Sequence, residues 1–157
     1  MTAAEKSIVG WREWVALPQI GIERIKAKVD TGARTSALHA FKIEPFSRDG
    51  VDWLKIGIHP AQRKTAPEVW CEAAVLDRRV VRDSGGHEEA RFVIETPVTL
   101  GAVTRSIELT LTDRDNMGFR MLLGRTALRG FFIVDPARSY VVSRRSGQLH
   151  RKRIKTS

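Results

Sequence analysis

One stretch of the 157-residue sequence has the residue types and spacing of a carboxylate site, namely Asp30-Thr31-Gly32-Ala33. The segment before it, residues 24–29, alternates charged with apolar residues. That alternation predicts a half-buried strand and places Asp30 on its open face. Thr31-Gly32-Ala33 predicts a tight turn in which Gly32 adopts a conformation that a Cβ atom would forbid. The site could perform acid–base chemistry, and the alternative is a carboxylate that only caps its own turn.

The elements that position this stretch are predicted to be short strands. Apolar alternation and turn residues place strands at 9–17, 20–30 (broken near Gly21), 37–46, 51–58, 69–76, 98–100, 107–111, 131–134 and 140–142. The best helix signal lies at 126–129, directly after an apolar segment. Many short strands separated by turns, with few helix signals, indicate an all-β barrel or sandwich.

A β-hairpin is predicted between these strands. Val80-Val81-Arg82 and Arg91-Phe92-Val93-Ile94 form its arms, and Ser84-Gly85-Gly86 forms a flexible tip. Asp83-Ser84-Gly85 is a tempting second carboxylate motif. It follows Asp30 too closely for a second lobe, however, and Arg82 precedes it where an apolar strand residue is expected. We therefore assign it to the hairpin.

Length and composition favour one globular domain in a reducing compartment. The chain is long enough to bury a core of its own, and Cys71 is its single cysteine. Neither a membrane-spanning apolar run nor a signal-peptide segment is recognisable, which predicts a soluble, cytoplasmic protein without membrane association. Much of the net charge of +9 comes from six basic residues after position 143: Arg144, Arg145, Arg151, Lys152, Arg153 and Lys155. Residues 144–157 are predicted to form a flexible basic tail, with nucleic-acid binding as the sharper alternative.

Two segments in a fixed order resemble a known family. Val29-Asp30-Thr31-Gly32-Ala33 comes early, Met121-Leu122-Leu123-Gly124-Arg125 comes late, and the hairpin lies between them. This order is similar to that of the retropepsins, the dimeric aspartic proteases of the retroviral type. The longer signature from Val29 to Ala40 resembles a bacterial branch labelled "ATP-dependent zinc protease" and associated with RimK-type glutamate ligases. The resemblance covers roughly residues 10 to 143 and implies a closed β-barrel with a flap hairpin and one short C-terminal helix.

The resemblance also implies roles for individual residues. Asp30 would be the catalytic aspartate, Thr31 would brace the site across a dimer interface, and Gly32 would line the substrate backbone. The flap tip would be Gly85 and Gly86. Gly124 and Arg125 would support the catalytic loop from the start of the helix. One position departs from the retroviral pattern: Arg34 stands where an acid often pairs with the helix arginine, so Arg125 must find another acceptor.

A single good motif predicts a homodimer. Aspartic-protease chemistry uses two carboxylates that share one proton, since close like charges cannot both ionise. This chain offers one such aspartate, Asp30, so the pair would form across a molecular two-fold axis.

The predicted substrate is acidic. Guanidinium groups pair bidentately with carboxylates, and four arginines are expected around the cleft: Arg34, Arg78, Arg79 and Arg82. Thr35, Ser36 and His87 complete the predicted substrate-binding set. The family association narrows the substrate to glutamate tails of the kind that a RimK-type ligase adds, which gives a functional link to such a ligase.

No metal or other cofactor is predicted. The histidines and Cys71 are scattered, and His87-Glu88-Glu89-Ala90-Arg91 lacks the second histidine of a zinc-binding helix. A phosphate-binding Gly-rich loop for ATP is also missing. Two rival classes remain open. One is a catalytically silent β-barrel that binds RNA or a ribosomal surface through its tail, and the other is a zinc peptidase.

Overall fold

The computed structural model describes residues 5–82, 85–113 and 118–143 of the chain. Strands dominate this part, as the sequence predicts, and its one α-helix is the four-residue α1, Arg125–Leu128. The basic tail at 144–157 and residues Asp83 and Ser84 of the predicted hairpin lie outside the described residues. The division into a domain at 1–143 and a tail therefore stays a prediction.

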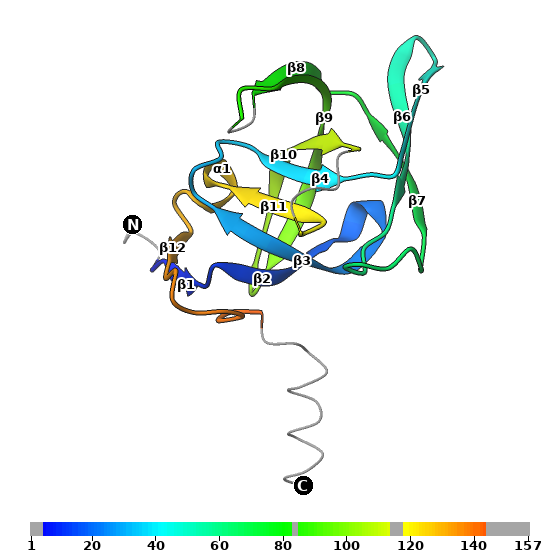
Figure 1. Cartoon of the computed structure of the whole chain (residues 1–157). Coiled ribbons are helices and arrows are strands. Elements are labelled where there is room, and N and C mark those ends of the chain that lie inside the picture. The colour runs from blue at the N-terminus through cyan, green and yellow to red at the C-terminus, as the bar shows by residue number, and fades with distance from the viewer. Residues whose placement is uncertain (1–4, 83–84, 114–117, 144–157) are drawn as a thin grey trace, which may run out of the picture.

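Six strands close into a barrel. They are β2 (Arg12–Leu17), β3 (Ile22–Asp30), β4 (Ser36–His39), β9 (Glu88–Leu100), β10 (Val103–Thr112) and β11 (Met121–Gly124). Their hydrogen-bonded order is β10-β4-β11-β3-β2-β9, and β9 pairs back onto β10 (Figure 1). Strand β8 (Asp77–Arg82) continues the sheet from β9 and forms the predicted hairpin with it. The predicted closed all-β barrel is confirmed.

Two smaller sheets lie outside this ring. Strands β5 (Lys42–Arg48), β6 (Val51–Ile58) and β7 (Val69–Ala74) form an antiparallel sheet that projects from one side of the barrel (Figure 1). Strands β1 (Ser7–Val9) and β12 (Phe132–Val134) form a parallel pair. A short 3-10 turn, η1 (Pro18–Ile20), joins β2 to β3, and Gly21 ends it with φ +80°, which explains the predicted break there.

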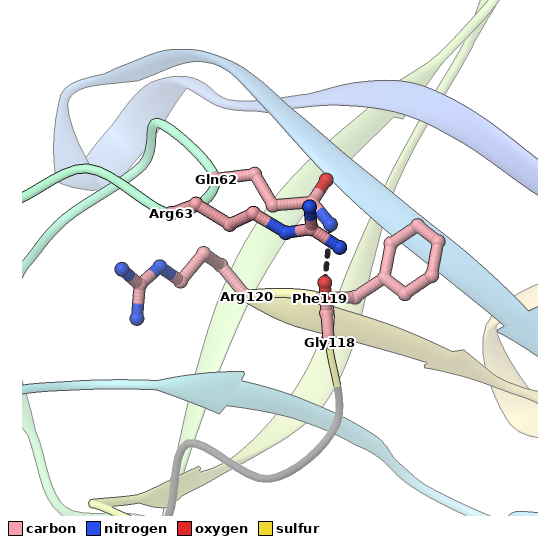
Figure 2. Close-up of a pocket in the computed structure, with 5 residues that line it drawn as sticks. All are labelled: Gln62, Arg63, Gly118, Phe119 and Arg120. Carbon is pink, nitrogen blue, oxygen red and sulfur yellow. Dashed lines mark hydrogen bonds between the residues drawn. The ribbon is translucent and has the colours of Figure 1, made fainter.

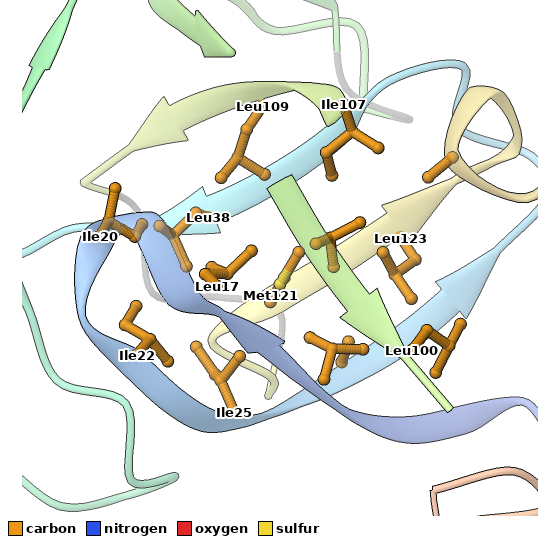
Figure 3. Packing of buried hydrophobic residues seen from close by; sticks show 14 of the residues in the cluster. Leu17, Ile20, Ile22, Ile25, Leu38, Leu100, Ile107, Leu109, Met121 and Leu123 are labelled. Carbon is orange, nitrogen blue, oxygen red and sulfur yellow. The ribbon is translucent and has the colours of Figure 1, made fainter. Parts of the chain in front are cut away.

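Most of the core lies inside the barrel, and Leu54, Ile56 and Ile58 of β6 extend it toward the outer sheet. Side chains of different barrel strands gather inside the barrel: Ile25 of β3, Leu38 of β4 and Met121 of β11 are fully buried in one cluster (Figure 3). Burial of these side chains supplies the main stabilising free energy, roughly 1.5–3 kcal/mol for each large apolar side chain.

Two predicted strands are in fact two strands each. Residues 9–17 are interrupted at Gly10, where a Cβ atom would lie 2.2 Å from the Arg138 carbonyl oxygen. Residues 37–46 divide because the chain changes sheets after β4. The Ala40 N–H still bonds to Thr112 of β10, whereas the Phe41 N–H bonds to Gly57 of β6. The opposite error occurs at 91–100. The hairpin arm predicted at 91–94 and the strand predicted at 98–100 are parts of one continuous strand, β9.

The strand predicted at 140–142 is wrong. This segment has no strand pairing, because the backbone N–H groups of Val141 and Ser143 bond to the carboxylate of Glu13, at 2.9 and 3.1 Å. Glu13 also accepts hydrogen bonds from the Gly10 N–H at 2.6 Å and the Ser143 hydroxyl at 2.6 Å. This carboxylate is 0% exposed. Three of its four hydrogen bonds, from Val141 and Ser143, join the C-terminal segment to β2.

Candidate active site

Asp30 ends strand β3 at a tight turn. It is half-buried, and its backbone lies beside Gly124 of the parallel strand β11. One carboxylate oxygen, Oδ1, accepts the Gly32 N–H at 2.9 Å, and the Asp30 carbonyl accepts the Ala33 N–H at 3.2 Å. Thr31 and Gly32 are exposed at the corner. The carboxylate is thus held at the surface by its own turn, through one of its two oxygens.

The reason for glycine at position 32 differs from the one expected. Gly32 is not among the residues with positive φ. A Cβ atom there would instead lie 3.1 Å from Asp30 Oδ1, the atom that accepts the Gly32 N–H. The position therefore requires space beside the carboxylate rather than a left-handed backbone.

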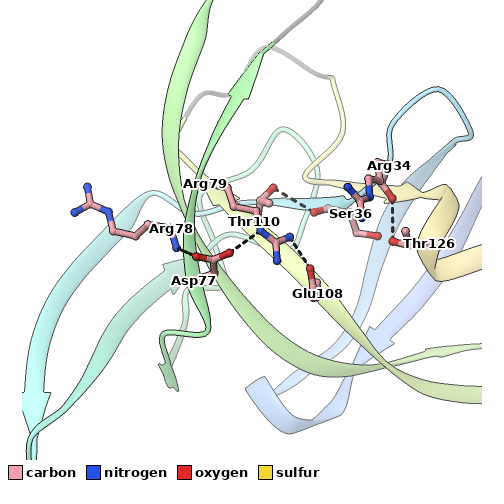
Figure 4. A network of polar contacts seen from close by, with 8 residues as sticks. All are labelled: Arg34, Ser36, Asp77, Arg78, Arg79, Glu108, Thr110 and Thr126. Atoms are coloured by element: carbon pink, nitrogen blue, oxygen red, sulfur yellow. Dashed lines mark hydrogen bonds and ion pairs between the residues drawn. The ribbon is translucent and has the colours of Figure 1, made fainter.

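The loop after Asp30 is fixed by the start of α1. The Arg125 N–H donates to Ala33 at 2.8 Å, and Thr126 donates to the Arg34 carbonyl through its N–H at 3.1 Å and its hydroxyl at 2.8 Å (Figure 4). The Arg125 guanidinium donates to the carbonyl oxygens of Thr31 and Gly32 at 3.4 and 3.3 Å. These two carbonyls are the acceptors that Arg125 uses in place of the acid that Arg34 replaces.

Gly124 lets the loop approach β11 closely. A Cβ atom at this position would lie 2.7 Å from the Thr35 carbonyl carbon and 2.9 Å from that of Arg34, and both are backbone atoms that cannot turn away. We expect Gly124→Ala to displace the loop, lower the free energy of unfolding by about 1–3 kcal/mol and reduce any activity that depends on Asp30. Urea unfolding and a catalytic assay would measure the two effects. The control is Ala102→Gly, at an exposed turn. Gly50→Ala is not suitable as a control, because Gly50 has φ +77° and a Cβ atom would strain its backbone.

Arg34, Thr35 and Ser36 are predicted to contact substrate, but the structure buries the last of them. Ser36 is 0% exposed, its hydroxyl accepts the Gly124 N–H at 3.0 Å, and its carbonyl accepts the Thr110 hydroxyl at 3.2 Å (Figure 4). Ser36 therefore ties the loop to β11 and β10 and does not face a substrate in this structure. Thr35 is half-buried, whereas Arg34 is exposed at the surface of the loop.

Two of the predicted cleft arginines are already paired within the chain. Arg79 donates to Asp77 at 2.8 Å and to Glu108 at 2.5 Å, and Arg82 bonds to Glu88 across the hairpin at 2.5 Å (Figure 4 shows the Arg79 pairs). Hydrogen bonding from Arg79 holds the pKa of Asp77 below its ordinary value, and the bond to Glu108 raises the pKa of Arg79. Arg78 lies over the Phe92 ring, 4.9 Å from its centroid. Binding of acidic substrate by these residues stays a prediction.

The hairpin predicted to act as the flap is present, formed by β8 and β9. Gly85, Gly86 and His87 are exposed, and Gly86 has φ +82° with open space around its Cα. Its glycine is required by the left-handed backbone of the turn. Closure of this hairpin over Asp30 remains a prediction.

A pocket that the sequence did not indicate lies at the other end of β11. It has a volume of about 170 Å³ and is lined by Gln62, Arg63, Gly118, Phe119 and Arg120 (Figure 2). Arg120 precedes β11, whereas Asp30 pairs with the last residue of that strand, so the two are about 13 Å apart along the sheet. The pocket is formed by residues from distant loops, and therefore no local motif reveals it.

Cys71 and the histidines do not form a reactive cluster in the part of the chain that is described. Burial raises the pKa of the Cys71 thiol to about 11, with a contribution from Glu72, so the thiol is not activated as a nucleophile. No three His, Cys, Asp or Glu side chains come together there as a metal site. Within the same residues, no helix is both long and apolar enough to cross a bilayer.

A closed barrel that presents Asp-Thr-Gly at a strand end, with Gly-Arg beneath it and a hairpin between them in sequence, defines the retropepsin-like class. The chain belongs to the RimB-like family, described as the retropepsin-like aspartic endopeptidase RimB, which it matches over residues 8–145. The resemblance drawn from the sequence is thereby confirmed.

The chain is also similar to longer proteins that are named as probable glutamate ligases. The chain is 48% identical over 132 residues to a probable alpha-L-glutamate ligase of Desulfotalea psychrophila and 49% identical over 135 residues to one of Parasynechococcus marenigrum. These matches cover 84% and 86% of the chain but 28% and 29% of the relatives, so the chain spans less than a third of their length. In fold, it is similar to a Legionella pneumophila protein of unknown function (DUF785), with a TM-score of 0.73 and 26% identity, over 88% of this chain and all of that one.

Proposed function

We propose that the chain is an aspartic endopeptidase whose active site combines Asp30 from two identical subunits. The observation that carries the proposal is the Asp30 corner: a surface carboxylate with one oxygen fixed by the Gly32 N–H and a loop clamped by Arg125 and Thr126. Clamping of this kind keeps a catalytic group in one orientation before substrate arrives. Family membership supports the same reaction class.

The reaction would be hydrolysis of a peptide bond. One Asp30 carboxylate takes a proton from a water held between the pair, and that water attacks the peptide carbonyl carbon. The other carboxyl, protonated, donates a hydrogen bond to the carbonyl oxygen as negative charge develops there. The C–N bond then breaks, the nitrogen takes a proton from the pair, and a new carboxyl group and a new amine leave.

Dimerisation is supported by apolar surface near the chain ends. Ile8 of β1 is 45% exposed, and Ile133 of β12 is 54% exposed. The two are directly paired in the β1–β12 sheet, and Phe131, also exposed, precedes β12. Apolar side chains gathered in this way favour contact with a second copy. We place the homodimer contact there.

The substrate would be an acidic, glutamate-rich polypeptide. The relatives are named as probable glutamate ligases, and an endopeptidase sharing a system with such a ligase would remove what the ligase adds. We propose that the chain acts in the cytoplasm, where it removes the glutamates that such a ligase adds. Arg34, exposed in the loop that follows Asp30, is the arginine best placed to select an acidic side chain.

Subunit mixing tests the shared active site. Parent chain and Asp30→Asn chain are combined in equal amounts, unfolded and refolded together, and assayed on a glutamate-rich peptide with a glutamine-rich peptide as control. If each site needs both Asp30 residues, random pairing leaves about a quarter of the activity of an all-parent sample. Retention of about half would show that each subunit works alone and would contradict the proposal.

A further inference from the structure

The outer face of strands β2 and β3 carries a group of basic side chains that the proposed active site does not use. Arg12 pairs in register with Lys28, and Trp14 pairs with Lys26. Their neighbours in sequence, among them Val15, Ala27 and Val29, point into the barrel, so these four point outward. We call Arg12, Lys26 and Lys28 the basic face.

These cations differ from the arginines of β8 in having no acidic partner. Arg79 and Arg82 are each bonded to carboxylates. By contrast, Arg12, Lys26 and Lys28 form no ion pair with any carboxylate among the residues that the structure describes, and Lys28 is exposed. A row of uncompensated positive charge raises the local concentration of an anionic partner and its rate of association.

Aromatic rings hold this charge in place. The Arg12 guanidinium lies 4.6 Å from the Trp11 ring centroid and 5.0 Å from that of Tyr140, and Lys26 Nζ lies 5.2 Å from that of Trp14. Tyr140 also stacks on Trp14. Cations fixed by such contacts lose less conformational entropy when a partner binds.

The same contacts distinguish between two classes of anionic partner, single-stranded nucleic acid and acidic polypeptide. Single-stranded nucleic acid binds by stacking its bases on open aromatic faces. The Trp14 ring is instead covered by Tyr140, with centroids 6.1 Å apart, and by Arg24, whose guanidinium lies 4.0 Å from its centroid. The face therefore offers cations for carboxylates rather than rings for bases, which favours an acidic polypeptide.

The basic face leads directly to Asp30. Lys26, Lys28 and Asp30 are alternate residues of β3, and alternate residues of a strand are about 6.7 Å apart. Alternate side chains of an extended polypeptide have the same spacing, so an acidic segment lying along β3 can match its carboxylates to the lysines. In the sequence, six further basic residues follow Ser143, whose hydroxyl accepts the Trp14 N–H at 2.6 Å.

We propose that the basic face binds an acidic segment of the polypeptide substrate outside the catalytic corner. This inference rests on the proposed endopeptidase function, which it extends by assigning a second site of substrate contact. It would give the protein affinity for glutamate-rich chains independent of the residues around the cleaved bond.

Binding by a catalytically blocked chain tests the proposal. The full chain carrying Asp30→Asn is titrated into a fluorescein-labelled peptide of ten glutamates, and anisotropy is followed at several salt concentrations. Adding Lys26→Gln and Lys28→Gln should weaken binding about tenfold and reduce its dependence on salt. Lys55→Gln is the matched control, because Lys55 Nζ also lies 5.2 Å from a tryptophan ring centroid, that of Trp70, but on β6. It should leave the affinity unchanged.

Each other result would overturn the proposal. Equal affinity of the double variant and its background would show that the basic face does not bind the peptide, and tighter binding of a ten-nucleotide single-stranded RNA would assign the face to nucleic acid. Lys28→Glu alone, at an exposed position, provides the same measurement if the double variant does not fold. Because binding is measured without cleavage, its failure is distinguishable from failure of Asp30 to act in catalysis.

Discussion

Asp30→Asn is expected to abolish cleavage of a glutamate-rich peptide, with a loss of at least about a thousandfold in kcat/KM. In the proposed homodimer this single change replaces both carboxylates of the pair, so neither a base for the water nor a shared proton remains. The fold should persist, because an asparagine side-chain oxygen can still accept the Gly32 N–H. Mass spectrometry of the peptide products would measure cleavage, and circular dichroism would confirm the fold.

Asp52→Asn provides the matched control for that experiment. Asp52 is an exposed aspartate of β6, in the sheet outside the barrel, and its loss of charge should leave kcat/KM within about twofold of the parent. Cleavage by the Asp30→Asn chain at the parental rate would remove Asp30 from the mechanism. It would leave the turn-capping role, which the Asp30–Gly32 hydrogen bond already fulfils.

Glu13→Ala is expected to cost the largest loss of stability, roughly 3–5 kcal/mol in the free energy of unfolding. The substitution leaves the N–H groups of Gly10, Val141 and Ser143 without their acceptor at buried or partly buried positions. Each buried donor without a partner costs about 1–3 kcal/mol, and relaxation of the C-terminal segment should recover part of the total. Urea unfolding followed by tryptophan fluorescence would measure the change, since Trp11 and Trp14 flank Glu13 in sequence.

Glu72→Ala is the control for Glu13→Ala, because it removes an exposed glutamate and should change the free energy of unfolding much less. Glu72 pairs with Arg48 at 2.9 Å on the exposed sheet outside the barrel, where an ion pair contributes at most about 1 kcal/mol. Glu13→Gln should fall between the two, because its amide keeps one accepting oxygen but turns a donor toward other donors. A loss below about 1 kcal/mol for Glu13→Ala would show that water replaces the carboxylate without difficulty.

Local patterns in the sequence determined the strand content and the candidate catalytic corner. Period-two alternation identified β6 with its bounds, and the order of Asp-Thr-Gly, hairpin and Gly-Arg predicted the family that the comparisons show. These features depend on residues that are neighbours in the chain, so they can be read without knowing how the strands pair. The predicted bounds fail where pairing is non-local, as at β4 and β5, which belong to different sheets.

Only the tertiary structure decided which polar side chains are available for binding. In the sequence, Ser36 resembles any hydroxyl near the motif, and Arg79 resembles any exposed arginine. The fold buries Ser36 against Gly124 and pairs Arg79 with Glu108, which is 29 positions away in the chain. It likewise encloses Glu13 with donors from the C-terminal segment and leaves Lys26 and Lys28 without a carboxylate among the described residues. Hydrogen bonds and ion pairs form between groups that strand register brings together, and register across a closed barrel is a property of the whole chain.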